Sequence, residues 1–171
     1  MSRAFLKDDT SGDQPIIPPR PALPAGSPNY VTPTGLEQLR TEMAELEAER
    51  TIAEANRDND ADRAWQLTIL NGKMAALKQR IATAKVIDPA AQPAGEVRFG
   101  ATVTLVTRKG GKVGFTRKFT IVGVDEANIA EGKIAFAAPI ARVVQGAKTG
   151  DVLTVKLGPA AEEVEVTKIE Y

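Results

Sequence analysis

Three aspartates at alternate positions are the side chains of this sequence best suited to chemistry: Asp58, Asp60 and Asp62. Carboxylate oxygens are the hard ligands that Mg²⁺ prefers, and Mg²⁺ usually takes one or two of them from a protein while keeping several waters. Aspartate and asparagine also favour tight turns and helix N-caps, so a polar hairpin turn can contain the same residues without any metal. The residues alone leave both interpretations open.

The chain has neither cysteine nor histidine, which excludes most familiar catalytic and metal sites. Thiolate metal sites and cysteine nucleophiles require cysteine. The Ser-His-Asp triad and imidazole acid-base chemistry require histidine. An EF-hand built on the three aspartates also fails, since Arg63 stands where the loop needs glycine and Ile69 where it needs a bidentate glutamate. A self-contained enzyme is therefore disfavoured.

Charge and hydropathy exclude two further classes of partner. The 171 residues include 22 basic and 22 acidic side chains, and a net charge of zero gives no bulk attraction to nucleic acid or to an anionic membrane. No apolar run approaches the roughly 20 residues that span a bilayer. The first residues also lack the basic-then-apolar layout of a signal peptide, so we expect a cytoplasmic protein with no membrane contact.

Two apolar series flank the aspartates and predict the element that positions them. Their members recur at steps of three and four: Leu36, Leu39, Met43 and Leu46, then Leu67, Leu70, Met74, Leu77, Ile81 and Ala84. This heptad spacing is typical of a coiled coil. Two such stripes with a short polar break predict an antiparallel helical hairpin within residues 30–88, with the aspartates at its tip. Trp65, just past the tip, is expected to pack over the end of the hairpin, and contact with a partner is the alternative.

The ends of the hairpin are marked by capping residues and prolines. Thr32 before a proline suits an N-cap, whereas Thr34 and Glu37 have the spacing of a capping box, and the sequence does not decide between these two starts. The second helix is expected to end near Asp88, where a proline follows, and residues 89–95 then form a linker.

From residue 96 the apolar period changes to two, which predicts a β-rich domain over residues 96–171. Apolar and polar residues alternate along the first expected strand, with Val97, Phe99, Ala101, Val103 and Leu105 on one face. Further strands are expected at 118–124, 134–136, 152–157 and 163–170, and a short helix at 139–144. The predicted fold class is therefore α+β, with a coiled-coil hairpin followed by a small, mostly antiparallel sheet.

Residues 1–29 form a proline-rich segment of low hydrophobicity, with six prolines between positions 15 and 28. Proline removes backbone donors and favours extended polyproline geometry over packing. We expect a disordered or loosely draped tail, with a proline-rich ligand for a partner domain as the alternative.

Taken in order, a series of short motifs resembles the Gre family of bacterial transcription factors. The motifs are YVTPTG (30–35), KVID (85–88), VRFGATV (97–103), IVGVDEA (121–127), APIAR (138–142), GD (150–151) and IEY (169–171). Each motif alone is weak, but their order and spacing together are specific. The resemblance covers everything except the proline-rich tail.

The resemblance implies an N-terminal coiled-coil finger and a C-terminal domain with an FKBP-like fold. In the family, this domain docks at the rim of the secondary channel of RNA polymerase, and the finger enters the channel. Acidic residues at the fingertip help the polymerase to hold a catalytic Mg²⁺, so that backtracked nascent RNA is cut. For this chain the implied Mg²⁺ ligands are Asp58, Asp60 and Asp62, within the polymerase complex only. We expect a monomeric accessory factor with no stably bound cofactor, and not an enzyme.

The resemblance also implies a docking surface on the β-rich domain. The matching positions are Asp125, Glu126, Ala138, Pro139, Ile140 and Arg142, with Ala138 where the family commonly has serine. We expect Asp125 and Glu126 to face basic residues of the polymerase. Pro139 is equally explained as the start of a helix.

This chain departs from the family at the fingertip. Its finger has roughly a dozen fewer residues, which shared over two helices retracts the tip by roughly 10 Å. The family's tip pattern, an aspartate followed three residues later by glutamate and asparagine, is absent. Two hypotheses follow: a factor that stimulates RNA cleavage, or a non-cleaving, Rnk-like regulator that occupies the same channel. A stand-alone peptide-bond isomerase and a direct nucleic-acid binder remain as rivals, and no sequence feature supports either.

Overall fold

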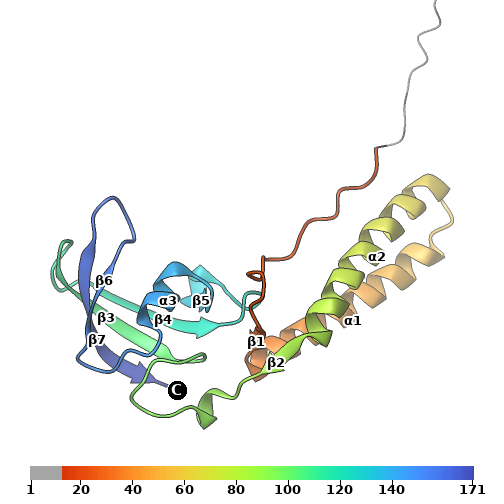
Figure 1. Ribbon diagram of the computed structural model, residues 1–171. Coiled ribbons are helices and arrows are strands. Elements are labelled where there is room, and N and C mark those ends of the chain that lie inside the picture. The colour runs from red at the N-terminus through yellow and green to blue at the C-terminus, as the bar shows by residue number, and fades with distance from the viewer. Residues whose placement is uncertain (1–12) are drawn as a thin grey trace, which may run out of the picture.

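The computed structural model describes residues 13–171, and its first unit is a long helical hairpin (Figure 1). Helix α1 (Pro33–Ala55) and helix α2 (Asp60–Ala82) run antiparallel. At their base, strand β1 (Asn29–Val31) pairs in parallel with strand β2 (Ala84–Val86). Among the described residues no helix has the length and apolar character needed to cross a membrane.

The heptad residues form the seam of the hairpin, as the sequence predicts. Its buried members are Val31, Leu39, Leu46, Ala53, Leu70 and Leu77, and the remaining apolar heptad residues pack against them. Thr32 is the N-cap of α1: its hydroxyl accepts a hydrogen bond from the Gly35 amide at 2.9 Å, and Pro33 follows in the first turn. Of the two starts left open by the sequence, the structure therefore has the threonine–proline cap.

The second unit, the β domain, is a curled five-stranded sheet. It is reached through the short 3₁₀ turn η1 (Pro89–Ala91). Its strands are β3 (Thr102–Lys109), β4 (Thr116–Val122), β5 (Lys133–Ala135), β6 (Val152–Val155) and β7 (Glu162–Glu170). They lie in the order β5-β4-β3-β7-β6, and only the β4–β5 pair is parallel. The α+β fold class is confirmed.

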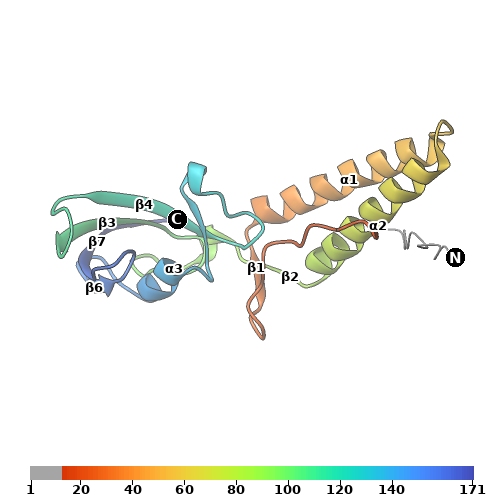
Figure 2. The same cartoon turned by 90° about the horizontal axis from the view of Figure 1, so that it is seen from above.

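One face of this sheet is covered by helix α3 (Pro139–Val144), which begins with the expected proline and follows the single turn η2 (Ile129–Glu131) and β5 (Figure 2). The alternation predicted along β3 is present, with Val103 and Leu105 fully buried. Tyr171 ties the last strand back to the start of the β domain, because its hydroxyl donates to the Glu96 carbonyl oxygen and accepts from the Arg98 amide.

The two units meet at the base of the hairpin through an aromatic cluster. Tyr30 of β1 packs between Phe99 and Phe136 of the β domain, with ring centroids 5.7 and 5.5 Å away. The backbones also approach closely, since a Cβ on Gly123 would lie only 2.6 Å from the Tyr30 carbonyl oxygen. Glycine is required where two backbones come this near. The hairpin is thus anchored by its first strand.

Residues 13–28, called the N-terminal strap below, lie along the hairpin (Figures 1 and 2). The sequence predicts a disordered or loosely draped tail over residues 1–29, and the described part is draped along the hairpin. The strap is held by side chains that composition does not reveal: Ile17 packs onto α2 at Gly72, and Arg20 makes ion pairs with two other elements. The rest of the predicted tail, residues 1–12, lies outside the described residues.

Candidate functional site

The turn at the hairpin tip is built by two asparagines and an arginine. Asn56 ends α1, and its side-chain oxygen accepts from the Asp58 amide at 2.9 Å. Asn59 is the N-cap of α2 and accepts from the amides of Ala61 and Asp62 at 3.0 and 3.1 Å. The Arg63 guanidinium then donates back to the Asn56 carbonyl oxygen at 2.9 Å. These bonds satisfy helix-end groups that would otherwise lack partners, so the turn is a well-ordered platform.

The three tip aspartates are all exposed, as expected, but they have different surroundings. Asp60 pairs with Arg63 at 2.8 Å, and Asp60 and Asp62 both lie in the first turn of α2, where the helix dipole favours negative charge. Within residues 13–171, no three acidic side chains gather so as to hold a metal ion. The site thus offers separate carboxylates to a second molecule and is not a closed metal cage.

Apolar side chains also reach the surface near the tip. Trp65, which the sequence predicts to pack over the end of the hairpin, is 44% exposed, and Ile52 on the facing helix is 72% exposed. The heptad seam explains both, because each residue lies outside the row of buried heptad positions. The tip therefore combines acidic and apolar surface.

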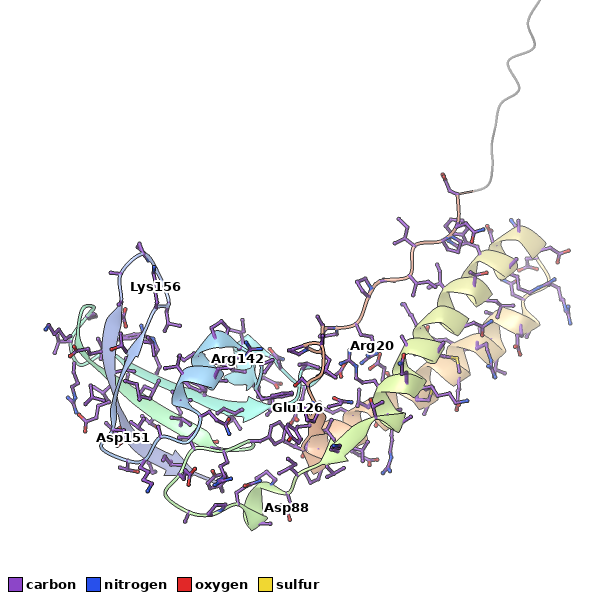
Figure 3. The ribbon with its side chains drawn as sticks, viewed as in Figure 1. Arg20, Asp88, Glu126, Arg142, Asp151 and Lys156 are labelled. Atoms are coloured by element: carbon purple, nitrogen blue, oxygen red, sulfur yellow. The ribbon has the colours of Figure 1, made fainter. Side chains whose placement is uncertain are left out.

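The expectation that Asp125 and Glu126 face a partner is wrong for this structure. The Asp125 side chain is only 6% exposed, and its oxygens pair with Arg20 of the strap at 3.0 Å and with Arg80 of α2 at 3.3 Å. Glu126 is buried and accepts a 2.6 Å hydrogen bond from the Thr32 hydroxyl. Both carboxylates follow β4 on a turn that lies against the hairpin base, so they join the two units (Figure 3).

The α3 positions divide between core and surface. Ile140 packs in the core of the β domain and is not available to a partner, which corrects the docking role predicted for it. Ala138 is partly buried, whereas Pro139 and Arg142 are exposed, and Figure 3 shows Arg142 on this helix. A helix that packs one face on a sheet necessarily divides its residues in this way. The exposed surface that remains for docking is Pro139 and Arg142.

The strongest electrostatic feature of the junction is Arg20. Its guanidinium holds both oxygens of Glu42 on α1, at 2.7 and 3.0 Å, and its Nε donates to Asp125 at 3.0 Å. The hydrogen bonds to Glu42 raise the pKa of Arg20 above its ordinary value, against the opposing effect of burial. The side chain is thus a permanently charged link between two acids.

Sequence reasoning missed Arg20, Arg80 and Asn59. Asn59 could have been recognised, because an asparagine directly before a helix is an N-cap signal. Arg20 and Asp125 are 105 positions apart in the chain, so no local spacing connects them.

Comparison with known proteins identifies the family. Residues 92–171 match the family model described as "Transcription elongation factor, GreA/GreB, C-term". The transcription elongation factor GreA of Alkalilimnicola ehrlichii is 36% identical over 155 residues, covering 82% of this chain and 96% of that protein. GreA of Ralstonia nicotianae is 35% identical over 156 residues, with the same coverage.

Among solved structures, the GreA factor homolog 1 (Gfh1) protein of Thermus thermophilus matches with a TM-score of 0.39 and 21% identity, covering 85% of this chain and all of that one. The assignment rests on the sequence relatives, whose likeness extends over nearly their whole length. It confirms the resemblance found in the motifs, and this chain belongs to the GreA/GreB family of transcription elongation factors.

Proposed function

We propose that this protein binds bacterial RNA polymerase as an accessory factor and places its hairpin in the secondary channel. Membership of a transcription elongation factor family supports this partner. The shape supports the mode of binding: two 23-residue helices carry the tip about 35 Å from the base with only one narrow apolar seam. Such an element can bring a charge into a narrow opening because its two helices bury only this seam and need no wider core.

We further propose that the tip stimulates cleavage of backtracked nascent RNA. The observation that carries this proposal is the exposure of three carboxylates within five residues at the end of a rigid hairpin. Asp58 and Asp62 have no ion-pair partner within residues 13–171, so both are free to complete an oxygen ligand set, whereas Asp60 is held by Arg63. Mg²⁺ bound jointly with the polymerase would activate the water that attacks the RNA phosphodiester.

The residues present fit such a shared ion and do not fit a resident one. One or two protein carboxylates suffice for Mg²⁺, and the tip can offer that number without rearrangement. Asn59 and Arg63 act as positioning residues, since they fix the turn that presents Asp58 and Asp62. The chemistry then belongs to the polymerase, and this chain supplies ligands and their placement.

A specific observation favours a second candidate, a channel-occupying regulator that does not stimulate cleavage. The alignment with the A. ehrlichii factor spans 155 positions, yet 82% of this 171-residue chain is only about 140 residues. About 15 aligned positions are therefore missing here, in agreement with a shortened finger. A tip that stops short of the reaction centre would block the channel without donating ligands.

The β domain is proposed as the unit that docks at the channel rim. With Asp125, Glu126 and Ile140 occupied inside the molecule, the exposed face of α3 with Pro139 and Arg142 is the proposed contact. An arginine on an exposed helix face suits an acidic partner surface.

Backtracked elongation complexes with end-labelled RNA and Mg²⁺ test both candidates. We compare the wild-type protein with the triple variant Asp58→Ala, Asp60→Ala and Asp62→Ala. The matched control removes the same charge lower on α1, with alanine at the exposed residues Glu45, Glu47 and Glu49.

Shortened RNA with the wild type and the control, but not with the tip variant, is the result expected of a cleavage factor. If no protein shortens the RNA, yet the wild type displaces a cleavage-competent relative from the same complexes, the channel-occupying candidate holds. Absence of both effects would overturn the proposal that the hairpin enters this channel.

A further inference from the structure

Arg20 connects three separate parts of the molecule through one side chain. Its guanidinium grips Glu42 of α1 with both terminal nitrogens and reaches Asp125 of the β domain with Nε. The Arg20 side chain is 16% exposed, so these bonds are largely shielded from solvent. Bidentate pairing of an arginine with a carboxylate adds attraction and also fixes the relative orientation of the two side chains.

Arg80 of α2 completes the network from the other helix. Its Nε lies 3.3 Å from Asp125, and its Nη2 donates to the Pro21 carbonyl oxygen of the strap at 2.6 Å. Asp125 therefore lies between two guanidinium groups, one from the strap and one from the hairpin. Removal of one partner from a buried ionic cluster leaves the remaining charges poorly compensated.

The strap also makes an apolar contact farther along α2. A Cβ added to Gly72 would lie 2.0 Å from Cδ1 of Ile17, so Ile17 occupies the place of the missing side chain. Glycine within a helix costs about 1 kcal/mol relative to alanine. This unfavourable choice has a structural reason here, because it lets the strap lie directly on the helix.

The Arg20 bridge can resist tilting of the hairpin because Glu42 lies well away from the base. The direct links between hairpin and β domain all lie near the base: Thr32 with Glu126, Tyr30 with its aromatic neighbours, and Arg80 with Asp125. Arg80 is only two residues from the end of α2. Glu42 is nine residues beyond the start of α1, or about 14 Å along the helix. A restraint applied at that height resists tilting far better than one at the pivot.

We propose that Arg20 is a positioning residue that, through the N-terminal strap, fixes the angle at which the hairpin leaves the β domain. If the hairpin tilted by roughly 10°, its tip, about 35 Å from the base, would move by about 6 Å. This displacement is larger than the distance between a metal ion and its oxygen ligands. This inference rests on the fold and its contacts, and it does not require that the partner be a polymerase.

Spin-label distance measurements on the full chain test the proposal. The chain has no cysteine, so Thr51→Cys near the tip of α1 and Thr116→Cys at the start of β4 give one label on each unit, both at exposed positions. Pulsed dipolar spectroscopy then reports the distribution of distances between the units. The variants are Arg20→Ala, the conservative Arg20→Lys, and the control Arg40→Ala. Within residues 13–171, Arg40 makes only an exposed ion pair with Glu37.

We expect Arg20→Ala to broaden the distance distribution at least twofold, Arg20→Lys to give an intermediate width, and Arg40→Ala to leave it unchanged. A distribution of wild-type width in Arg20→Ala overturns the proposal. Ile17→Asp provides a second route, because it should lift the strap without removing an ion-pairing group and should broaden the distribution similarly. Since no polymerase is present, failure here is distinguishable from failure of the cleavage experiment.

Discussion

At the scale of single residues, the tip turn depends on Asn59 more than on its aspartates. The Asn59 side chain satisfies two amides at the start of α2, whereas the aspartate side chains mainly add charge. The local structure and the proposed chemistry are therefore carried by different side chains. This separation makes the aspartates replaceable without unfolding the tip.

Replacement of Asn59 by alanine should accordingly destabilise the hairpin by about 1 kcal/mol, the usual cost of losing an N-cap. Thermal unfolding followed by far-UV circular dichroism measures the change. Asn59→Asp is the control, because aspartate caps helices equally well and should preserve the midpoint. Equal losses in both variants would contradict the capping role.

The last residue gives a second prediction, which depends on pH. Burial raises the pKa of the Tyr171 hydroxyl above 10.0, its ordinary value, so the folded state retains the proton that the unfolded chain loses first. The hydroxyl thus contributes stability in full below about pH 10 and loses it as the pH rises through the folded-state pKa.

We expect Tyr171→Phe to lower the free energy of unfolding by about 1 kcal/mol at neutral pH, through loss of its bonds to Glu96 and Arg98. The difference from the wild type should shrink above pH 10. Urea unfolding at pH 7 and pH 11 measures both values, and a difference that grows with pH would disprove the assignment.

At the scale of elements, helix α2 and the strap are coupled through Gly72 and Ile17. In an Ile17→Ala background, Gly72→Ala should raise the thermal midpoint, because alanine gains up to about 1 kcal/mol in a helix. With Ile17 present the gain should be smaller or absent, since the new methyl group meets its side chain. The double-mutant cycle isolates this coupling, and additive effects would show that the strap does not contact α2 in solution.

The sequence predicts local elements well and their mutual contacts poorly. The heptad positions identify both helices and their seam because the period is a local property. The contacts that hold the strap are not predicted, because proline content describes the backbone and says nothing of Ile17 or Arg20 finding partners on the hairpin. The sequence predicts an outward-facing Asp125 for a similar reason: its motif is visible in the sequence, but the strap arginine that covers it is 105 residues away.

At the scale of the whole molecule, reach is the quantity that separates the two candidate functions. One heptad inserted into each helix at facing positions, after Arg50 and before Gln66, would lengthen the hairpin by about 10 Å and keep its seam in register. The β domain and its junction would be unaffected, because both insertions lie in the outer half of the hairpin.

If the shortened finger limits cleavage, the lengthened protein should shorten backtracked RNA faster than the wild type under the same conditions. The rate of appearance of the cleaved fragment measures this. The same insertion combined with alanine at Asp58, Asp60 and Asp62 is the control and should be inactive. An unchanged or lower rate in the lengthened protein would show that reach is not limiting.

The N-terminal strap also changes the thickness of the hairpin along its length. Beyond Gly72, on the side of the tip, lie the first twelve residues of α2, about 18 Å of helix. From Gly72 down to the base, the strap adds a third layer of chain to the two helices. Between Gly72 and the base, the described hairpin is therefore thicker than a pair of helices. If the hairpin enters a channel as proposed, an opening wide enough for two helices alone would not admit this thicker part.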